Sequence, residues 1–179
     1  MRQRRSKEQE AEGVMRLDLS KIIEMPGAEE RFAVTLDPEH LINPSVQGYA
    51  RPPEASGKVV NTAGLLDLRG TVRAHMHCVC DRCGREFDRE KTVEVDVPLV
   101  TDAEGETAED AFRIEGDCID VNEVLETCFI LGMETKLLCR EDCRGLCPKC
   151  GKDLNEGPCG CTGEKDPRLA VLAKLLDNA

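Results

Sequence analysis

Residues 65–97 read LLDLRGTVRAHMHCVCDRCGREFDREKTVEVDV, and this stretch decides the fold. Apolar and polar side chains alternate on both sides of its centre, which is the pattern of a half-buried strand. We predict strands over 63–78 and 87–100, and the turn at Cys80 and Cys83 lets the second strand return antiparallel to the first. Similar alternation earlier in the chain predicts further strands over 15–19, 31–36, 45–51 and 57–61.

Helical spacing replaces this alternation after an acidic segment, 101–117. Asp120 and Glu123 have the spacing of a capping box, so we predict a helix over about 121–134. Its predicted apolar face consists of Val121, Val124, Leu125, Cys128, Leu131 and Met133. Asp166 before Pro167 predicts the start of a C-terminal helix that packs on the core.

The composition of the chain excludes several classes of protein. With 179 residues and a net charge of −11, the chain is not a polycation that coats nucleic acid. Aromatic side chains make up 3%, too few for a platform on which bases stack. The sequence shows neither an apolar run of the ~20 residues that a membrane span needs nor the pattern of a secretory signal. We therefore expect a cytoplasmic protein whose thiols stay reduced.

The chain has 11 cysteines and three histidines, and in a reducing compartment paired cysteines indicate metal ligands. The most specific group is Cys147, Cys150, Cys159 and Cys161, in which a Cys-x2-Cys turn is followed by a Cys-x-Cys pair. Four soft, charged thiolates suit tetrahedral zinc. Residues 139–165 contain few large apolar side chains, so this segment needs a bound metal ion in order to fold. We predict a four-cysteine zinc site here.

A second candidate group consists of Cys80 and Cys83, at the end of a predicted strand, and Cys139 and Cys143, which follow the predicted helix. A metal ion shared by these four thiolates would tie the β-rich region to the C-terminal half of the chain. The sequence therefore predicts one or two Zn²⁺ per chain.

The spacing of the cysteines leaves two alternatives to this grouping open. Cys78 competes with Cys80 as a ligand, because both lie on the same face of the predicted strand. In a second partition, Cys80 and Cys83 share a site with Cys147 and Cys150, while the cysteines at 139, 143, 159 and 161 form the other site.

Other reactive residues are assigned no role in chemistry. Cys118 is isolated in the sequence, and Cys128 is a small core residue on the apolar helix face. His75 and His77 alternate with the strand cysteines, so they point to the opposite face. The sequence has no nucleophile elbow, phosphate-binding loop or His-Glu-x-x-His motif, and a metal held by four cysteines leaves no position for a catalytic water. We therefore predict that the protein is not an enzyme.

Together these elements predict an α+β fold: an antiparallel β-rich N-terminal region followed by a helix, a cysteine-rich zinc module and a C-terminal helix. We divide the chain into residues 1–14, a disordered tail or the product of a start codon misassigned upstream of Met15; residues 15–100, the β-rich region; residues 101–117, an acidic loop; and residues 118–179, the helix, zinc module and terminal helix.

The order of these motifs resembles the YceD family, which is named for the accumulation of large-subunit ribosomal RNA. A strand ends in Cys80-Asp-Arg-Cys83, an acidic insert leads to Ile119-Asp-Val121, and the string LCREDCRGLCPKCGKDLN at 138–155 precedes Cys159-x-Cys161 and Asp166-Pro-Arg-Leu-Ala. The resemblance covers about residues 15–178. It implies a cytoplasmic bacterial or plastid protein that large-subunit ribosomal RNA needs in order to accumulate, with no known enzyme activity.

A short basic stretch is a candidate contact with RNA. Residues 136–152 carry five basic and two acidic side chains, a net charge of +3. We expect Arg140, Arg144, Lys149 and Lys152 to contact phosphates of large-subunit ribosomal RNA or of a precursor particle. Alternatively, the protein is an adaptor that binds a basic ribosomal protein through its acidic loop. A third hypothesis is a zinc-dependent enzyme.

Overall fold

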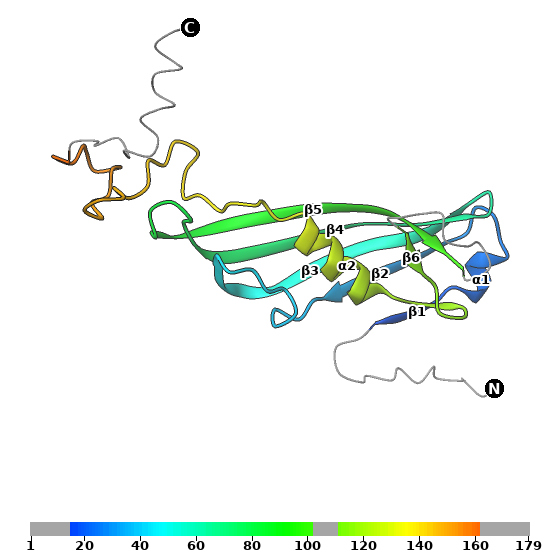
Figure 1. The fold of residues 1–179 in the computed structure, drawn as a ribbon. Helices are drawn as coiled ribbons and strands as arrows, with labels where there is room; N and C mark the ends of the chain where they lie inside the picture. The colour runs from blue at the N-terminus through cyan, green and yellow to red at the C-terminus, as the bar shows by residue number, and fades with distance from the viewer. Residues whose placement is uncertain (1–14, 102–110, 162–179) are drawn as a thin grey trace, which may run out of the picture.

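The structure is a computed structural model that describes residues 15–101 and 111–161. Its main element is a long, twisted sheet of five strands in the order β2-β3-β4-β5-β6 (Figure 1). These strands are β2 (Glu29–Thr35), β3 (Val46–Thr62), β4 (Leu65–Val79), β5 (Glu86–Val100) and β6 (Phe112–Arg113). Neighbours pair antiparallel, except for the parallel pair of β5 and β6. The chain has the antiparallel-rich α+β fold that the sequence predicted.

A second, two-stranded sheet joins distant parts of the chain. It pairs β1 (Arg16–Asp18) antiparallel with β7 (Cys118–Asp120). The short helix α1 (Ser20–Ile23) follows β1, and α2 (Val121–Leu131) follows β7 directly. In Figure 1, α2 lies across one face of the five-stranded sheet. The core lies between this helix and the sheet.

Asp120 starts α2 as the sequence predicted. Its carboxylate accepts hydrogen bonds from the backbone N–H groups of Asn122 and Glu123, which have no partner within the helix. The first turns of α2 then bury Val121, Val124, Leu125 and Phe129 against the inner face of the sheet, where Leu68, Val72, Met76 and Val95 are also buried. Burial of this apolar face holds the helix in place.

A pair of glycines lets the ring of Phe32 approach the backbone closely on the inner face of the sheet. Gly57 of β3 lies opposite Gly70 of β4, and Phe32 of β2 lies beside Gly57 in the same row. A Cβ atom on Gly57 would stand 2.7 Å from Cζ of Phe32 and 2.3 Å from the carbonyl oxygen of Arg69. The ring of Phe32 therefore takes the space that two side chains would otherwise fill.

The two predicted strands at 45–51 and 57–61 form one continuous strand, β3, contrary to the prediction. Two consecutive prolines, Pro52 and Pro53, interrupt the alternation of this segment. They fall at a register shift between Arg51 and Glu54, and pairing with β2 extends only to Glu54. Neither proline has a pairing partner in β4 at this bulge, so the sheet tolerates two residues that have no N–H to donate.

The helix differs from its prediction at its C-terminal end. α2 ends at Leu131 instead of residue 134, and Leu131 is 79% exposed although we placed it on the apolar face. With 3.6 residues per turn, the face that buries Leu125 continues through Phe129 and not through Leu131. Cys128 is half-buried and packs against the core, as expected. The short elements α1, β6 and β7 were not predicted.

Several predictions concern residues outside the described ranges. The tail at 1–14, most of the acidic loop at 101–117 and the C-terminal helix that begins at Asp166 belong to this group. They remain predictions from the sequence.

Two cysteine clusters as candidate metal centres

The first cluster joins two parts of the chain that are far apart in sequence. Cys80 and Cys83 lie in the turn between β4 and β5, and Cys139 and Cys143 lie in the segment after α2. The four sulfur atoms all lie within 4.8 Å of one another. The Sγ atoms of Cys80 and Cys143 are 3.7 Å apart, as are those of Cys83 and Cys139. Three of these side chains are buried and that of Cys139 is half-buried.

The turn between β4 and β5 shapes one half of this cluster. The backbone N–H of Cys80 donates to the carbonyl of Arg85 (2.9 Å), and that of Gly84 donates to the carbonyl of Cys80 (2.9 Å). Gly84 has φ of +68°, a left-handed conformation that glycine adopts without strain. This turn brings both sulfurs to one side.

The segment after α2 is held against the same turn. Asp81 makes two hydrogen bonds with Leu137 of this segment. Its N–H donates to the carbonyl of Leu137, and its carboxylate accepts from the N–H of Leu137. Further back along β5, Lys91 pairs with Glu134 (3.1 Å) and Arg89 donates to the carbonyl of Leu138 (2.8 Å). These contacts carry Cys139 and Cys143 to the end of the sheet.

The second cluster is local and more open to solvent. Its members Cys147, Cys150, Cys159 and Cys161 also have all four sulfurs within 4.8 Å of one another. Cys147 is buried and Cys159 is half-buried, whereas Cys150 and Cys161 are exposed.

Its first two cysteines repeat the turn of the first cluster. The N–H of Cys147 donates to the carbonyl of Lys152 (2.8 Å), and that of Gly151 donates to the carbonyl of Cys147 (2.9 Å). Gly151 has φ of +72°. The same backbone hydrogen bonds therefore present a pair of sulfurs in each cluster.

Contacts through the β4–β5 turn connect the two clusters. Arg82 donates from Nη1 to the carbonyl of Cys143 (2.8 Å), and its own carbonyl accepts from the N–H of Leu146 (3.1 Å). Arg85 pairs with Asp153, in the loop of the second cluster (3.1 Å). A single β turn thus carries two cysteines of the first cluster and supports the segment that leads to the second.

The thiols within each cluster differ in acidity. Burial raises the pKa of Cys80, but several hydrogen bonds from backbone amides outweigh it and lower this pKa to about 6. Amides of Cys150 and Lys149 lower the pKa of Cys147 to about 6 as well. Burial and neighbouring thiols raise the pKa of Cys139 to about 12, and the Cys150 thiol together with burial raises that of Cys161 to about 12.

Each cluster therefore combines a readily ionised thiol with one that resists ionisation. Neighbouring thiolates repel one another, and this repulsion makes ionisation of all four sulfurs costly. A divalent cation at the centre removes that cost, because it attracts each thiolate. Both clusters can hold a metal ion.

The structure groups the cysteines in the first of the two predicted partitions. Cys78 belongs to the apolar core and not to either cluster. Cys118 and Cys128 also lie outside both clusters. His75 and His77 lie on the other face of β4, where their Nδ1 atoms approach Glu90 and Asp88 of β5. The alternation of side chains along a strand accounts for this placement.

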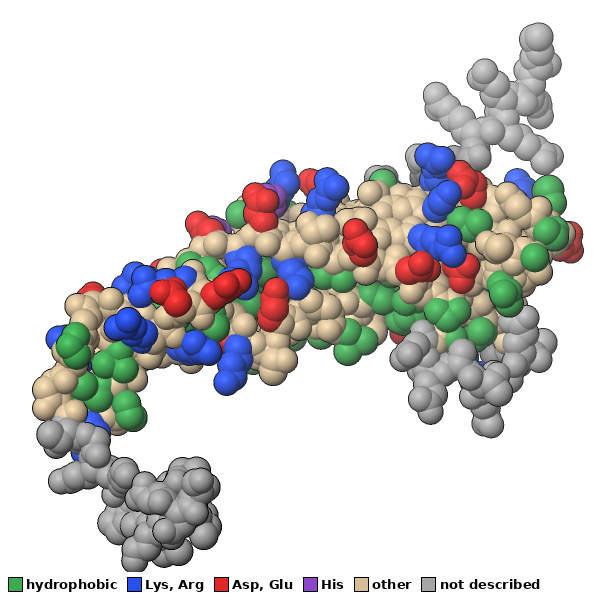
Figure 2. Space-filling view, turned by 90° about the horizontal axis from the view of Figure 1, so that it is seen from above, with side chains coloured by type: hydrophobic (Ala, Val, Ile, Leu, Met, Phe, Trp, Pro, Cys, Tyr) green, Lys and Arg blue, Asp and Glu red, His purple; other side chains and the backbone are tan. Residues whose placement is uncertain are grey.

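The four basic residues that we predicted to contact RNA are all exposed near the clusters. Arg140 pairs with Asp142 (3.3 Å), and Lys152 donates to the carbonyl of Pro158 (3.1 Å). In Figure 2, Lys and Arg side chains are more frequent toward the end of the molecule at the left, where Asp and Glu interrupt them. The surface there is mixed in charge, so any contact with phosphate depends on individual side chains.

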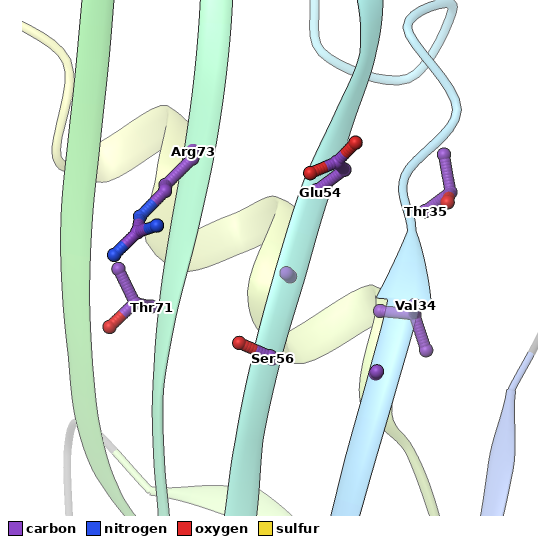
Figure 3. A pocket seen from close by; sticks show the side chains of 8 residues that line it. Val34, Thr35, Glu54, Ser56, Thr71 and Arg73 are labelled. Carbon is purple, nitrogen blue, oxygen red and sulfur yellow. The ribbon is translucent and has the colours of Figure 1, made fainter.

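A shallow depression of about 450 Å³ lies away from both clusters, on the outer face of the sheet. In Figure 3, Thr71 and Arg73 of β4, Glu54 and Ser56 of β3 and Thr35 line it, and α2 passes on the opposite side of the sheet. Its lining includes no cysteine or histidine. The candidate metal centres are therefore separate from this hollow.

The fold and the two clusters together define a class: small α+β proteins in which a long sheet ends in paired four-cysteine centres. Within that class, the chain belongs to the YceD family, described as large ribosomal RNA subunit accumulation protein, whose family model matches residues 68–176. This match covers more than half of the chain and confirms the resemblance found in the sequence.

Curated relatives add little to this assignment. Uncharacterized proteins of Mycobacterium bovis and Mycobacterium tuberculosis are 34% identical to the chain over 64 residues. The aligned part is 36% of this chain and 31% of each relative, so the chain spans about a third of the length of the curated relatives it matches. No solved structure matches the chain significantly. Among the described residues, no helix has both the length and the apolar character to cross a membrane.

Proposed function

We propose that the protein is a non-enzymatic, zinc-binding factor of the cytoplasm that supports assembly of the large ribosomal subunit. The observation that carries this proposal is the family match, because it spans residues 68–176 and so includes every cysteine of both clusters. A family named for ribosomal RNA accumulation thus shares the part of the chain that contains the candidate metal centres.

The geometry of the sulfurs supports zinc as the metal. A zinc ion bound by four thiolates at about 2.3 Å in a tetrahedron places neighbouring sulfurs about 3.8 Å apart. In the first cluster, the sulfurs of Cys80 and Cys143 and those of Cys83 and Cys139 are 3.7 Å apart. We propose that Cys80, Cys83, Cys139 and Cys143 hold one Zn²⁺, and that the second cluster holds another. Four protein ligands leave no open position on the metal, so zinc acts in the structure and not in catalysis.

We further propose that the module contacts RNA phosphates through Arg140, Arg144, Lys149 and Lys152. Two bound Zn²⁺ with eight thiolates would carry a net charge of −4, so the metal centres themselves do not attract RNA. The exposed basic side chains provide the attraction, and zinc fixes the backbone that carries them. A small number of basic side chains can bind RNA phosphates together only when the backbone holds them at a fixed spacing.

Separation of ribosomal particles on a density gradient, combined with RNA crosslinking, tests this proposal. Replacement of the four basic residues by alanine should lower the fraction of protein bound to large-subunit precursors, and the loss should be greater at low salt than at high salt. Zinc content should stay the same, because none of the four is a ligand. Unchanged association and crosslinking would contradict the phosphate contacts.

A basic ribosomal protein as the partner is the second candidate function. One observation favours it: β5 presents a row of exposed acidic side chains on its outer face, at Glu86, Asp88, Glu90, Glu94 and Asp96. Glu86→Gln and Glu94→Gln on this face, combined with deletion of residues 103–110 in the acidic loop, distinguish the two candidates. If these changes abolish association while the four alanine substitutions have no effect, the protein acts as an adaptor.

A further inference from the structure

Asn155 belongs to the loop of the second cluster, but its side chain contacts the first cluster. It lies between Cys150 and Cys159 in the chain. Its Nδ2 atom donates a hydrogen bond to Sγ of Cys143 over 3.4 Å. Its Oδ1 atom accepts one from the backbone N–H of Arg144, next to that cysteine, over 2.8 Å. A side chain from one cluster thus touches a candidate ligand of the other.

The loop of the second cluster determines where this side chain lies. Oδ1 of Asp153 accepts from both the backbone N–H (2.8 Å) and Nδ2 (2.7 Å) of Asn155. The N–H of Leu154 donates to the carbonyl of Gly145 (2.9 Å), which holds the loop against the segment after Cys143. The loop contains few large apolar residues, so we expect a metal ion bound by its four cysteines to add to these hydrogen bonds in fixing its shape.

We infer that Asn155 couples the two clusters, so that metal in the second cluster raises the affinity of the first cluster for metal. This inference rests on the metal binding proposed for both clusters. An N–H donor stabilises the negative charge of a metal-bound thiolate and orients it. Loss of such a partner outside the ligand shell typically lowers metal affinity about 10- to 100-fold. Coupling between binding sites is reciprocal, so metal in the first cluster favours loading of the second by the same factor.

Asn155→Asp in the full chain separates the donor from the acceptor. The substituted side chain keeps an oxygen for the N–H of Arg144, loses the N–H groups that reach Cys143 and Asp153, and adds a negative charge beside the first cluster. We expect the zinc affinity of the first cluster, measured by competition with a chelator, to fall about 10- to 100-fold. With ¹¹³Cd²⁺ in place of zinc, the resonance of the first cluster should also shift. Glu156→Gln, at the exposed neighbouring position, is the matched control and should change neither quantity.

Cys161→Ser is the second variant of the experiment, because it weakens metal binding by the second cluster without changing a residue of the first. It should lower the zinc affinity of the first cluster in the otherwise natural chain and have little further effect in the Asn155→Asp chain. If both clusters bind metal and Cys161→Ser leaves the affinity of the first unchanged, the coupling is wrong while the metal sites stand. A natural chain that holds no metal in either cluster would overturn the proposed metal binding and the coupling together.

Discussion

The two cysteine clusters contain the same kind of turn but connect different parts of the chain. In each, the first cysteine N–H donates to the carbonyl five residues later, and a glycine with positive φ follows the second cysteine. The first cluster joins Cys80 to Cys143 and is largely buried, so it ties the end of the sheet to the segment after α2. The second closes the short segment 147–161 on itself and exposes two of its cysteines. The same local motif thus serves long-range attachment in one place and local closure in the other.

The largest expected effect comes from breaking the first cluster with Cys83→Ser. Structural zinc sites contribute apparent binding energies of roughly 10–16 kcal/mol at pH 7, as large as the stability of a whole domain. Hydrogen exchange in zinc-replete buffer should show lost protection over 80–85 and 137–145, the two stretches that this cluster joins, while 147–161 keeps the protection that its own metal gives.

Cys150→Ser, in the second cluster, is the matched comparison. Because that cluster closes only its own loop, lost protection should be confined largely to 146–161. Equal footprints for the two variants would contradict the difference between long-range and local closure.

A change in the sheet should have a smaller effect and leave both clusters loaded. Gly57→Ala places a Cβ atom 2.3 Å from the carbonyl of Arg69, so backbone must move. Overpacking of this kind costs about 1–3 kcal/mol of unfolding free energy. Gly48→Ala, also in β3, is the control, because a Cβ atom there meets nothing within 4 Å. Denaturant unfolding should separate the two variants while zinc content stays equal. Loss of zinc in Gly57→Ala would mean that the clusters depend on this part of the sheet.

The smallest expected effect is a pH dependence remote from both clusters. The hydrogen bond that Glu126 of α2 accepts from the ring of His40 raises the pKa of His40 above its ordinary value. A raised pKa means that this contact contributes its full stability below the pKa of the unfolded chain and loses it as pH rises through the folded value. Between pH 6 and 8, the unfolding midpoint should fall slightly more in the natural chain than in His40→Gln. Identical pH profiles for the two chains would show that the contact between His40 and Glu126 does not contribute to stability.

Alternation along the chain was enough to predict the long strands, because one face of the sheet is buried and the other is exposed. Alternation and helical spacing gave wrong predictions at two places where apolar character and burial do not coincide or where proline interrupts a strand. Pro52 and Pro53 made one strand look like two, and the structure accommodates them at a register shift. Leu131 is apolar but exposed, so the predicted apolar face of α2, drawn from approximate helical spacing, wrongly included it.

The grouping of the cysteines could be predicted only as a set of alternatives. Spacing identifies local pairs such as Cys80 and Cys83, because a short turn determines their geometry. It does not reveal which distant pair meets them, since that depends on the path of the chain between β5 and Cys139. The contact of Asn155 with Cys143 is of the same kind, and no pattern in the sequence indicates it.

The number of zinc ions per chain tests the central claim most directly, that two separate four-cysteine centres each hold one ion. Elemental analysis and native mass spectrometry of the full chain, purified without added metal, should give two zinc ions per chain. Cys80→Ser should reduce this to about one, with the 147–161 segment still loaded. A value of one that Cys80→Ser leaves unchanged, or a metal-free chain in which both clusters stay ordered, would contradict the claim.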